Sequence, residues 1–383
     1  MHDLVLVGGG PVGLALVHAL ADSGLSVALV EARETLSAED PRVIALAQGS
    51  RLILERIRVW PHLAAQATAI ETIHVSRQGG FGRAELSAAE AGVPALGYCV
   101  EYGALYAALA AGLPGGAIEL VTGARVVGLA PGAEGGEIQY LRAGSTHRLA
   151  ARLIVVADGG KGLPMALGAY KDYRQSALLA RVRCERPIPG RAFERFTAEG
   201  PIALLPLGDE YALVWTTPAR ALETRMRLSD AEFLQGLTDA FAGRLGRFTA
   251  CGPRAAFPLR LMQALEDGRP GLVRIGNAAQ SLHPVAGQGF NLGLRDAWML
   301  AQAVLDAPVD TLGSAGFIAA HLARRRRDVL GGIGMTDLLV DAFADRLPTG
   351  LAPLRGLALA ALDLTPPLKR LFARKMMFGM QAW

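Results

Sequence analysis

The stretch Gly8-Gly9-Gly10-Pro11-Val12-Gly13 decides the fold of this chain. Four apolar residues, 4–7, precede it and predict a short buried strand, while residues 14–23 predict a helix that stops at Gly24. Residues 26–31 predict a second strand, so the three elements form a β-α-β unit of about 30 residues. A glycine-rich turn inside such a unit is typical of folds that bind dinucleotides.

Each glycine of the G-x-G-x-x-G pattern has its own role in that prediction. Gly8 permits the tight turn, Gly10 lets the backbone approach a pyrophosphate, and Gly13 lets the helix pack closely on the strand. The helix N-terminus then offers free N–H groups to the phosphates. Glu31 ends the second strand roughly 20 residues further on, where an acid that binds ribose is expected. We therefore predict an adenine dinucleotide site, with a tight turn alone as the alternative.

Composition favours one large domain or two closely joined ones. The chain has 383 residues, 51% hydrophobic and 19% charged, which allows a large core and argues against disorder. Its three cysteines, Cys99, Cys184 and Cys251, are scattered, as expected in a reducing cytoplasm without a disulfide framework or a clustered metal site. The net charge of +4 is mild, and no nucleic-acid partner is expected.

Two further stretches need an interpretation. Residues 4–21 are mostly apolar, but they lack a basic start and the glycines and Pro11 interrupt them, so neither a signal peptide nor a membrane span is expected. Four consecutive arginines, Arg324 to Arg327, are interpreted as the solvated face of a helix.

Two later motifs follow predicted strands. Residues 153–157 end at Asp158-Gly159, which by itself is an ordinary turn pair. Residues 272–275 lead into Gly276-Asn277-Ala278-Ala279-Gln280-Ser281-Leu282-His283-Pro284-Val285-Ala286-Gly287-Gln288-Gly289-Phe290-Asn291-Leu292-Gly293, and a helix is expected over 289–305. The start of that helix presents several backbone N–H groups, which suit a flavin ring edge that becomes anionic on reduction. Between these motifs, residues 177–183, 192–197, 202–207 and 211–216 predict a β-rich insert.

At these residues the chain resembles the group A flavoprotein aromatic hydroxylases, because the glycine turn, the Asp-Gly pair and the motif with Pro284 and Gly287-Gln288-Gly289 occur in the family's order. Asp40-Pro41-Arg42-Val43-Ile44-Ala45-Leu46 is similar to the family's arginine loop, which implies that Arg42 lies along the FAD pyrophosphate and ribityl chain. The resemblance implies an α/β fold: a Rossmann-like FAD-binding domain with an inserted β-sheet substrate domain, like p-hydroxybenzoate hydroxylase, plus C-terminal helices. The expected boundaries are 1–75, 98–175 and 255–325 for FAD, 76–97 and 176–254 for substrate, and 326–383 for the helices.

Within the family, the chain is most similar to the ubiquinone-biosynthesis hydroxylases of the 2-polyprenyl-6-methoxyphenol branch. The stretches that carry this likeness are Gly276-Asn277-Ala278-Ala279-Gln280, Ala192-Phe193-Glu194-Arg195-Phe196-Thr197, Gly200-Pro201, Leu205-Pro206-Leu207, Gly97-Tyr98-Cys99-Val100-Glu101 and Thr336-Asp337. Two positions depart from the family pattern. Asn277 replaces a carboxylate that would bind a ribityl hydroxyl more tightly, and Lys161 stands where many members carry a basic or serine-containing run, as a candidate contact for the nicotinamide cofactor.

The expected cofactors are FAD and, as co-substrate, NAD(P)H. The predicted cofactor-binding residues are Gly8, Gly10, Pro11, Val12, Gly13, Glu31, Ala32, Arg42, Asp158, Gly159, Gly276, Asn277, Gly287, Gln288, Gly289, Phe290 and Asn291. Pro284, Gly289 and Phe290 are predicted to position the flavin loop, without a side-chain acid or base, and His283 is only a weak candidate for proton traffic. The candidates for lining the ring, each with core packing as the alternative, are Phe193, Phe196, Leu205, Trp215 and Phe257.

The resemblance implies a monooxygenase that reduces FAD with NAD(P)H, forms a flavin hydroperoxide with oxygen, and hydroxylates the ring of a polyprenyl phenol in ubiquinone biosynthesis. The alternatives are a hydroxylase of a small soluble phenol, an FAD-containing assembly subunit of a ubiquinone-synthesis complex, and a flavin reductase of isoprenoid double bonds. Residues 368–378 mix basic and apolar side chains and Trp383 ends the chain. This end is expected either to contact the inner face of the cytoplasmic membrane or a partner from the same pathway, or to close the core as an amphipathic helix; the expected location is cytoplasmic.

Overall fold

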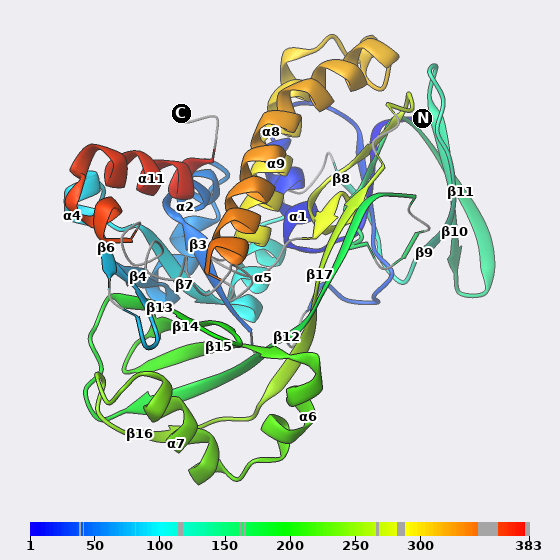
Figure 1. The fold of residues 1–383 in the computed structure, drawn as a ribbon. Helices are drawn as coiled ribbons and strands as arrows, with labels where there is room; N and C mark the ends of the chain where they lie inside the picture. The colour runs from blue at the N-terminus through cyan, green and yellow to red at the C-terminus, as the bar shows by residue number, and fades with distance from the viewer. Residues whose placement is uncertain are drawn as a thin grey trace.

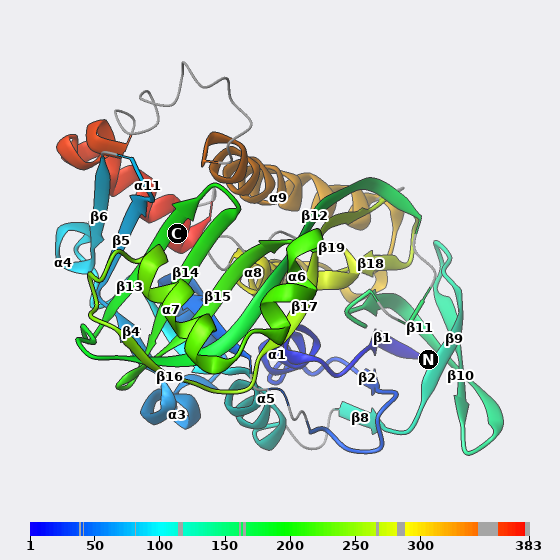
Figure 2. The same ribbon diagram turned by 60° about the horizontal axis from the view of Figure 1, so that its bottom comes forward.

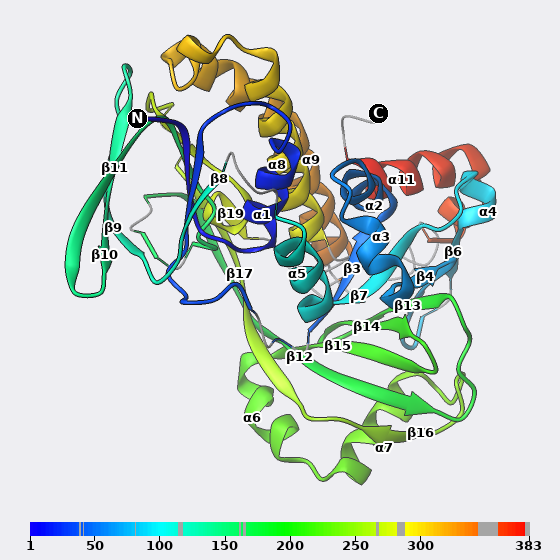
Figure 3. The same cartoon turned by 180° about the vertical axis from the view of Figure 1, so that it is seen from behind.

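The computed structural model describes residues 1–37, 40, 42–80, 82–113, 118–160, 162–163, 166–265, 268–281, 288–343 and 359–379. Within the helix Ala315–Phe343, side chains are described for residues 315–331 and 334. Three sheets and a group of helices make up this part of the chain (Figures 1 to 3).

The first sheet contains the predicted β-α-β unit and has seven strands in the order β8-β2-β1-β11-β10-β9, with β18 beside β11. Its strands are β1 His2–Val7, β2 Val27–Val30, β8 Ile118–Val121, β9 Arg125–Ala130, β10 Gly136–Arg142, β11 Ser145–Val156 and β18 Leu272–Arg274. The pairs β1–β2, β2–β8, β1–β11 and β11–β18 are parallel, so the predicted motifs at the ends of β1, β2, β11 and β18 meet at one edge of the sheet.

The second sheet holds the predicted β-rich insert and has nine strands in the order β19-β17-β12-β15-β14-β13-β5-β6, with β16 beside β12. Its strands are β5 Thr72–Arg77, β6 Arg83–Ser87, β12 Leu167–Cys184, β13 Arg191–Thr197, β14 Gly200–Leu207, β15 Glu210–Pro218, β16 Phe248–Cys251, β17 Ala255–Ala264 and β19 Gln280–Ser281. A small third sheet of β3 Val43–Ala47, β7 Gly97–Glu101 and β4 Thr68–Ile70 lies above it in Figure 1.

Helices pack against each of the three sheets. They are α1 Pro11–Ala19, α2 Gln48–Arg56, α3 Trp60–Leu63, α4 Ala88–Ala91, α5 Tyr102–Ala111, α6 Ala219–Arg227, α7 Asp230–Ala240, α8 Gln288–Asp306, α9 Ala315–Phe343 and α11 Pro366–Phe378, with the short 3-10 turns η1 Ala64–Gln66, η2 Gly276–Ala278 and η4 Val309–Thr311. One face of the first sheet packs on α1, α5 and α8, and its other face packs on side chains of β9 and β10. Figure 2 shows α6 and α7 in front of the second sheet, and Figure 3 shows α1 beside α5.

The predicted strands and the helix of residues 289–305 are present, but two strands begin well before their expected starts: β11 begins at Ser145 rather than at residue 153, and β12 begins at Leu167 rather than at residue 177. The insert also contains α6 and α7, which the strand pattern did not predict. A capping box between Ser229 and Glu232 begins α7, and Phe233 and Leu237 on one face of this helix bury against the second sheet. Because β5, the whole of β12 and β17 pair within the second sheet, we propose that the substrate-domain segments extend to about residues 72–97 and 167–264.

The C-terminal stretch folds into α11, one face of which closes against α2 and α4. Lys369, Ala373 and Met377 are buried on that face, and the Lys369 ammonium lies 2.8 Å from a Glu90 carboxylate oxygen. Leu368 and Leu371 remain exposed on the other face. Among the described residues, no helix is both long and apolar enough to cross a membrane.

Candidate functional site

The glycine turn fits its surroundings only because two of its residues lack a side chain. Gly8 has φ +106°, and a Cβ there would lie 2.7 Å from the Ala157 carbonyl oxygen. A Cβ on Gly13 would lie 2.2 Å from the Gly8 carbonyl oxygen. The turn therefore packs directly on the end of β11, where Asp158 follows Ala157.

Gly10 differs from these two glycines because it faces open space. A Cβ built on Gly10 finds no atom within 4 Å. Gly10 is also the N-cap of α1, its cap receives no side-chain hydrogen bond, and Pro11 is the first helical residue. The first-turn N–H groups of a helix have no partner within the helix, and the helix dipole favours an anion there. Open space at this end of α1 fits a diphosphate.

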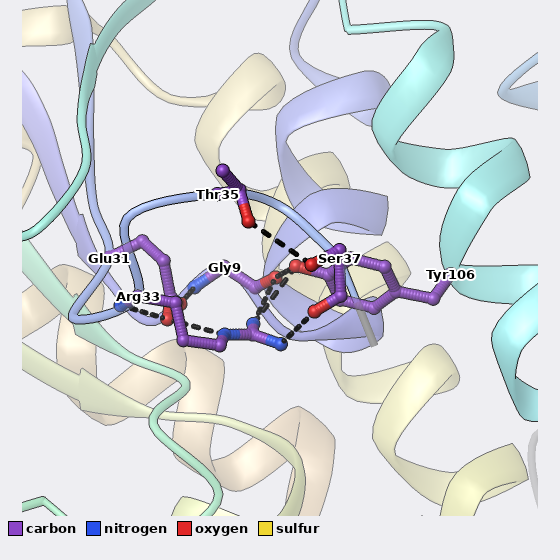
Figure 4. A network of polar contacts seen from close by, with 6 residues as sticks. All are labelled: Gly9, Glu31, Arg33, Thr35, Ser37 and Tyr106. Atoms are coloured by element: carbon purple, nitrogen blue, oxygen red, sulfur yellow. Dashed lines mark hydrogen bonds and ion pairs between the residues drawn. The ribbon is translucent and has the colours of Figure 1, made fainter. Parts of the chain in front are cut away.

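Glu31 lies beside the turn in a polar network (Figure 4). Its side chain is buried, and one carboxylate oxygen accepts a hydrogen bond from Gly9 N at 2.6 Å. The other oxygen accepts bonds from Arg33 N at 2.9 Å and Arg33 Nε at 2.7 Å. Burial alone would raise the pKa of Glu31, but the bonds from Arg33 and Gly9 lower it below its ordinary value. Glu31 is thus a carboxylate at neutral pH, able to accept bonds from ribose hydroxyls.

Two residues of this network were not among the predicted site residues. The Arg33 guanidinium donates to the Tyr106 hydroxyl at 2.9 Å, and that hydroxyl donates to the Gly9 carbonyl at 2.8 Å. Burial raises the pKa of Tyr106 to about 12, so the side chain remains a phenol that donates. Arg33 follows Glu31 by two residues and had a sequence signal. Tyr106 comes from α5, and nothing in the local pattern pointed to it.

The motifs of the first and last thirds of the chain meet around Val12. A Cβ on Gly276, where φ is +59°, would lie 3.1 Å from a Val12 methyl group. A Cβ on Gly293 would lie 3.0 Å from the other Val12 methyl group and 3.2 Å from Gly276 Cα. The turn of η2 and the helices α1 and α8 therefore approach one another through small residues.

The Asp-Gly motif lies on the same side of this junction. Asp158 accepts hydrogen bonds from the backbone N–H groups of Gly160, Gly162 and Leu163 at 2.9 to 3.0 Å, so its carboxylate shapes the loop after β11. Gly159 has φ +74° and open space beyond its Cα. A Cβ on Gly160 would lie 2.9 Å from the Asn277 carbonyl oxygen, which places this loop against η2.

The exposure of three predicted residues agrees with a ligand-facing edge. Asn277 is exposed between the buried residues Gly276 and Ala278. Ala32 is exposed directly after Glu31. Gly289, in the first turn of α8, has open space where a Cβ would stand, while Phe290 packs against the core of the first domain.

Asn291 joins α8 to the third sheet. Its amide oxygen accepts bonds from Ala47 N and Ser50 Oγ, both at 2.7 Å, and its amide nitrogen donates to the Ala45 carbonyl at 2.9 Å. Gln288, the first residue of α8, donates to the Met376 carbonyl of α11 at 3.3 Å. These contacts fix the start of α8 between β3 and the C-terminal helix.

A buried charged network next to η2 was not predicted from the sequence. An Asp296 carboxylate oxygen accepts bonds from Gly276 N at 3.1 Å and Gln280 Nε2 at 2.8 Å, and the other accepts from Arg325 Nε at 2.8 Å. Arg325 also contacts the Gln280 amide oxygen. Burial raises the pKa of Asp296 and lowers the pKa of Arg325 to about 10, which leaves the guanidinium charged at neutral pH.

This network corrects the interpretation of the arginine run. Arg324, Arg326 and Arg327 are exposed, as expected of a solvated helix face, but Arg325 is 1% exposed. A run of four identical residues spans more than one turn of helix, so one member turns inward. The buried acid that it meets, Asp296, lies on another helix and cannot be recognised from the run.

Arg42 lies where the first domain meets the second sheet. Its guanidinium pairs with Asp40 at 2.6 Å and lies over the rings of Tyr102 and Phe257, 5.1 and 5.4 Å from their centroids. Phe257 is 42% exposed. The arginine is held by an acid and two aromatic rings beside the glycine-turn domain.

The two faces of the second sheet correct part of the predicted ring lining. Phe193 and Trp215 are buried beneath α7, on the face opposite the third sheet. Leu205 and Phe196 lie on the other face, which we call the inner face: Leu205 packs with residues of β3, β4 and β7, and Phe196 with β5, β6 and residues 359 and 362. Alternation along a strand separates Phe193 from Phe196, a distinction that a list of aromatic residues does not make.

Several predicted residues lie outside the described residues. They are Lys161, His283, Pro284 and Gly287, together with Trp383 at the chain end.

Comparison with known proteins gives concordant matches. The protein family described as FAD binding domain matches residues 1–325. The chain is 36% identical over 387 residues to ubiquinone hydroxylase UbiL of Rhodospirillum rubrum, covering 98% of this chain and 89% of UbiL. It is 31% identical over 389 residues to 3-demethoxyubiquinol 3-hydroxylase of Escherichia coli K12, covering 96% of each. In fold it is similar to p-nitrophenol 4-monooxygenase PnpA of Pseudomonas putida, with a TM-score of 0.79 at 16% identity over 100% of this chain and 99% of PnpA.

Proposed function

Because the chain belongs to the FAD-binding-domain family of flavoprotein monooxygenases, we propose that it hydroxylates the aromatic ring of a polyprenyl phenol in ubiquinone biosynthesis, with NAD(P)H as reductant. The observation that carries this proposal is the match to UbiL over 98% of the chain, at 36% identity. A second full-length relative, 3-demethoxyubiquinol 3-hydroxylase, acts in the same pathway by its name. The FAD-dependent monooxygenase class comes from the family, and the polyprenyl phenol is our extension from these two relatives.

The residues that we propose to hold FAD line the edge where the parallel strands end. The N-terminus of α1 and the open space at Gly10 would receive the diphosphate, and Glu31 the ribose hydroxyls of the adenosine. Asn277, exposed beside Gly160, would meet the ribityl chain. The first-turn N–H groups of α8, at Gly289 and Phe290, would meet the pyrimidine end of the ring.

Bound FAD supplies the redox chemistry, which is electron transfer from NAD(P)H to oxygen for insertion into a ring. The protein binds, orients and excludes water. Asp296 and Arg325 position the backbone N–H of Gly276 from below, and Asn291 fixes α8 against β3. These residues do not touch the reacting atoms, and their role in our proposal is to hold the flavin-facing backbone still.

The inner face of the second sheet favours a neutral, apolar substrate over a small aromatic acid. A hydroxylase of a soluble phenolic acid would need a cation on this face to receive the substrate carboxylate. The partly exposed residues in register here are Glu194, Ala203, Val214 and Leu179. Arg181, two residues beyond Leu179 on the same face of β12, is already paired with Glu101 of β7 at 2.7 Å. The Glu194 carboxyl group would repel a substrate carboxylate, and the apolar side chains around it would contact an isoprenoid tail.

The test is complementation of bacterial strains that are each blocked at one ubiquinone hydroxylation step, with the accumulated intermediate identified by mass. We expect one strain to regain ubiquinone. Failure to restore any of the steps, with the protein expressed and yellow, would remove the polyprenyl phenol assignment. Restoration by a variant that binds FAD but does not oxidise NAD(P)H would instead favour an assembly subunit.

A further inference from the structure

On the inner face of the second sheet, Glu194 stands in a row of apolar residues. Strand pairing places Glu194 of β13 beside Ala203 of β14, Ala203 beside Val214 of β15, and Val214 beside Leu179 of β12. All four residues are partly exposed. Their neighbours on the opposite face, such as Phe193, are buried beneath α7. Figure 1 shows these strands side by side below β3 and β7.

This row lies across β3 from the start of α8. Asn291 of α8 bonds to the backbone of Ala45 and Ala47 at 2.9 and 2.7 Å. Ala45 packs in turn against the cluster of Ile70, Cys99 and Ala192, and Ala192 precedes Glu194 by two residues on the same face of β13. A continuous chain of contacts therefore connects the proposed flavin-facing turn of α8 to the face that presents Glu194.

Glu194 has no polar partner among the residues that the structure describes. Its register partners on the neighbouring strands are Val75 and Ala203, and both are apolar. The adjacent Arg195 points to the other face, where it donates to the Ala240 carbonyl. Buried acids in folded proteins are normally paired, so an unpaired carboxyl at a partly open position is available for a ligand.

Burial in these surroundings raises the pKa of Glu194 to about 7. Elements around this face carry other titratable groups. The Cys99 thiol of β7 stays neutral because burial raises its pKa, and Arg181 of β12 pairs with Glu101 of β7 at 2.7 Å. Arg77 lies on β5, and Asp363 accepts a bond from Glu85 N. A carboxyl that exchanges its proton near neutral pH has the property expected of a general base.

We propose that Glu194 is the general base that accepts the proton of the substrate phenol. The inference rests on the proposed function, because it needs a phenol on this face. The phenol O–H bond breaks, an O–H bond forms on a Glu194 carboxylate oxygen, and the electron pair stays on the phenol oxygen. Nothing is oxidised or reduced in this step. The phenolate gains electron density at the ring carbons ortho and para to its oxygen, which favours attack on an electrophilic oxygen atom.

The difference in pKa between the substrate phenol and Glu194 determines when the proton is transferred. A phenol has a pKa of about 10, roughly three units above that of Glu194, so complete transfer before the reaction is unfavourable by about a thousandfold. Proton transfer therefore accompanies the oxygen transfer, and general-base help of this kind is worth about 10²- to 10⁴-fold.

The test compares Glu194→Gln with the unaltered protein, using 2-farnesylphenol as the probe. Glutamine keeps the size and one acceptor of glutamate but does not take up a proton. We expect hydroxylation to slow about 10²- to 10³-fold, while FAD content stays unchanged. The rise in kcat through neutral pH should disappear in the variant. Glu194→Asp should recover part of the rate, and Glu210→Gln, which removes a surface charge from the same sheet, should behave like the unaltered protein.

Two readouts separate proton transfer from a structural role. A ring-fluorinated analogue of the probe has a more acidic phenol. It should raise the hydroxylation rate of Glu194→Gln by a larger factor than it raises the rate of the unaltered protein. Ultraviolet difference spectra of the bound fluorinated probe, without NAD(P)H, should show more phenolate with Glu194 than with glutamine. A purely structural role moves neither readout.

Equal turnover and an unchanged pH profile in Glu194→Gln would overturn the proposal and leave the proposed function standing. Absence of hydroxylated probe from the unaltered, FAD-loaded protein would instead overturn the proposed function, and this inference with it. If Glu194→Gln fails to fold, the pH profile of the unaltered protein decides: a flat kcat between about pH 6 and 8 contradicts a base with this acidity.

Discussion

The buried Asp296–Arg325 pair allows a direct test of what supports Gly276 and the other residues that we propose to bind FAD. Asp296→Asn keeps the shape of the side chain and removes its charge, so the buried Arg325 guanidinium loses the carboxylate that its Nε contacts. Both side chains are at most 1% exposed, and breaking such a pair costs about 3–5 kcal/mol of unfolding free energy. The bond to Gly276 N also weakens, which should raise the FAD dissociation constant by roughly 5- to 100-fold, or about 1–3 kcal/mol.

Urea unfolding followed by tryptophan fluorescence measures the first effect, and titration of the apoprotein with FAD measures the second. The double variant Asp296→Leu with Arg325→Met should recover most of the unfolding free energy, because two apolar side chains replace two buried charges. It should not recover FAD affinity, since leucine offers Gly276 N no acceptor. An Asp296→Asn loss below about 1 kcal/mol with unchanged FAD affinity would refute this reasoning.

Three further predictions follow from the same geometry. Gly13→Ala should lower the unfolding free energy of the apoprotein by about 1–3 kcal/mol, because its Cβ would lie 2.2 Å from the Gly8 carbonyl oxygen; a loss under a few tenths would contradict that clash. Gly10→Val should leave apoprotein stability nearly unchanged but abolish FAD retention, since its side chain fills the open space before α1; a yellow purified variant would argue against a diphosphate there. His321 is 2% exposed, with both ring nitrogens lacking a partner among the described residues, and burial lowers its pKa to about 4. The unfolded chain therefore binds the extra proton, so stability should fall by up to about 1.4 kcal/mol per pH unit as pH drops from 6.5 toward 4, and urea titrations of His321→Leu should show a shallower fall than the unaltered protein.

Local pattern was enough to predict the parts of the fold that depend on contiguous residues. The Gly8–Gly13 turn, the strand before it and Glu31 form one short segment, and the structure keeps them together. The helix that starts near Gly289 was predictable for the same reason, since an apolar period of 3.6 residues follows a glycine-rich turn.

The supporting contacts were not predictable because they join distant segments. Tyr106 reaches Gly9 from α5, and Arg325 reaches Asp296 from α9. Glu194 was quoted only as part of a family likeness, and no acid or base was predicted in the site. Its significance depends on which face of β13 it occupies and on the lack of a partner there, and both are properties of the assembled sheet.

Incubation of the purified, FAD-loaded protein with 2-farnesylphenol and NAD(P)H under ¹⁸O₂ tests the central claim most directly. We predict a hydroxylated product that contains one ¹⁸O atom per added hydroxyl group, formed only when reductant and oxygen are both present. Oxidation of NAD(P)H with no ¹⁸O in the recovered phenol would contradict the proposed hydroxylation of a prenylated ring.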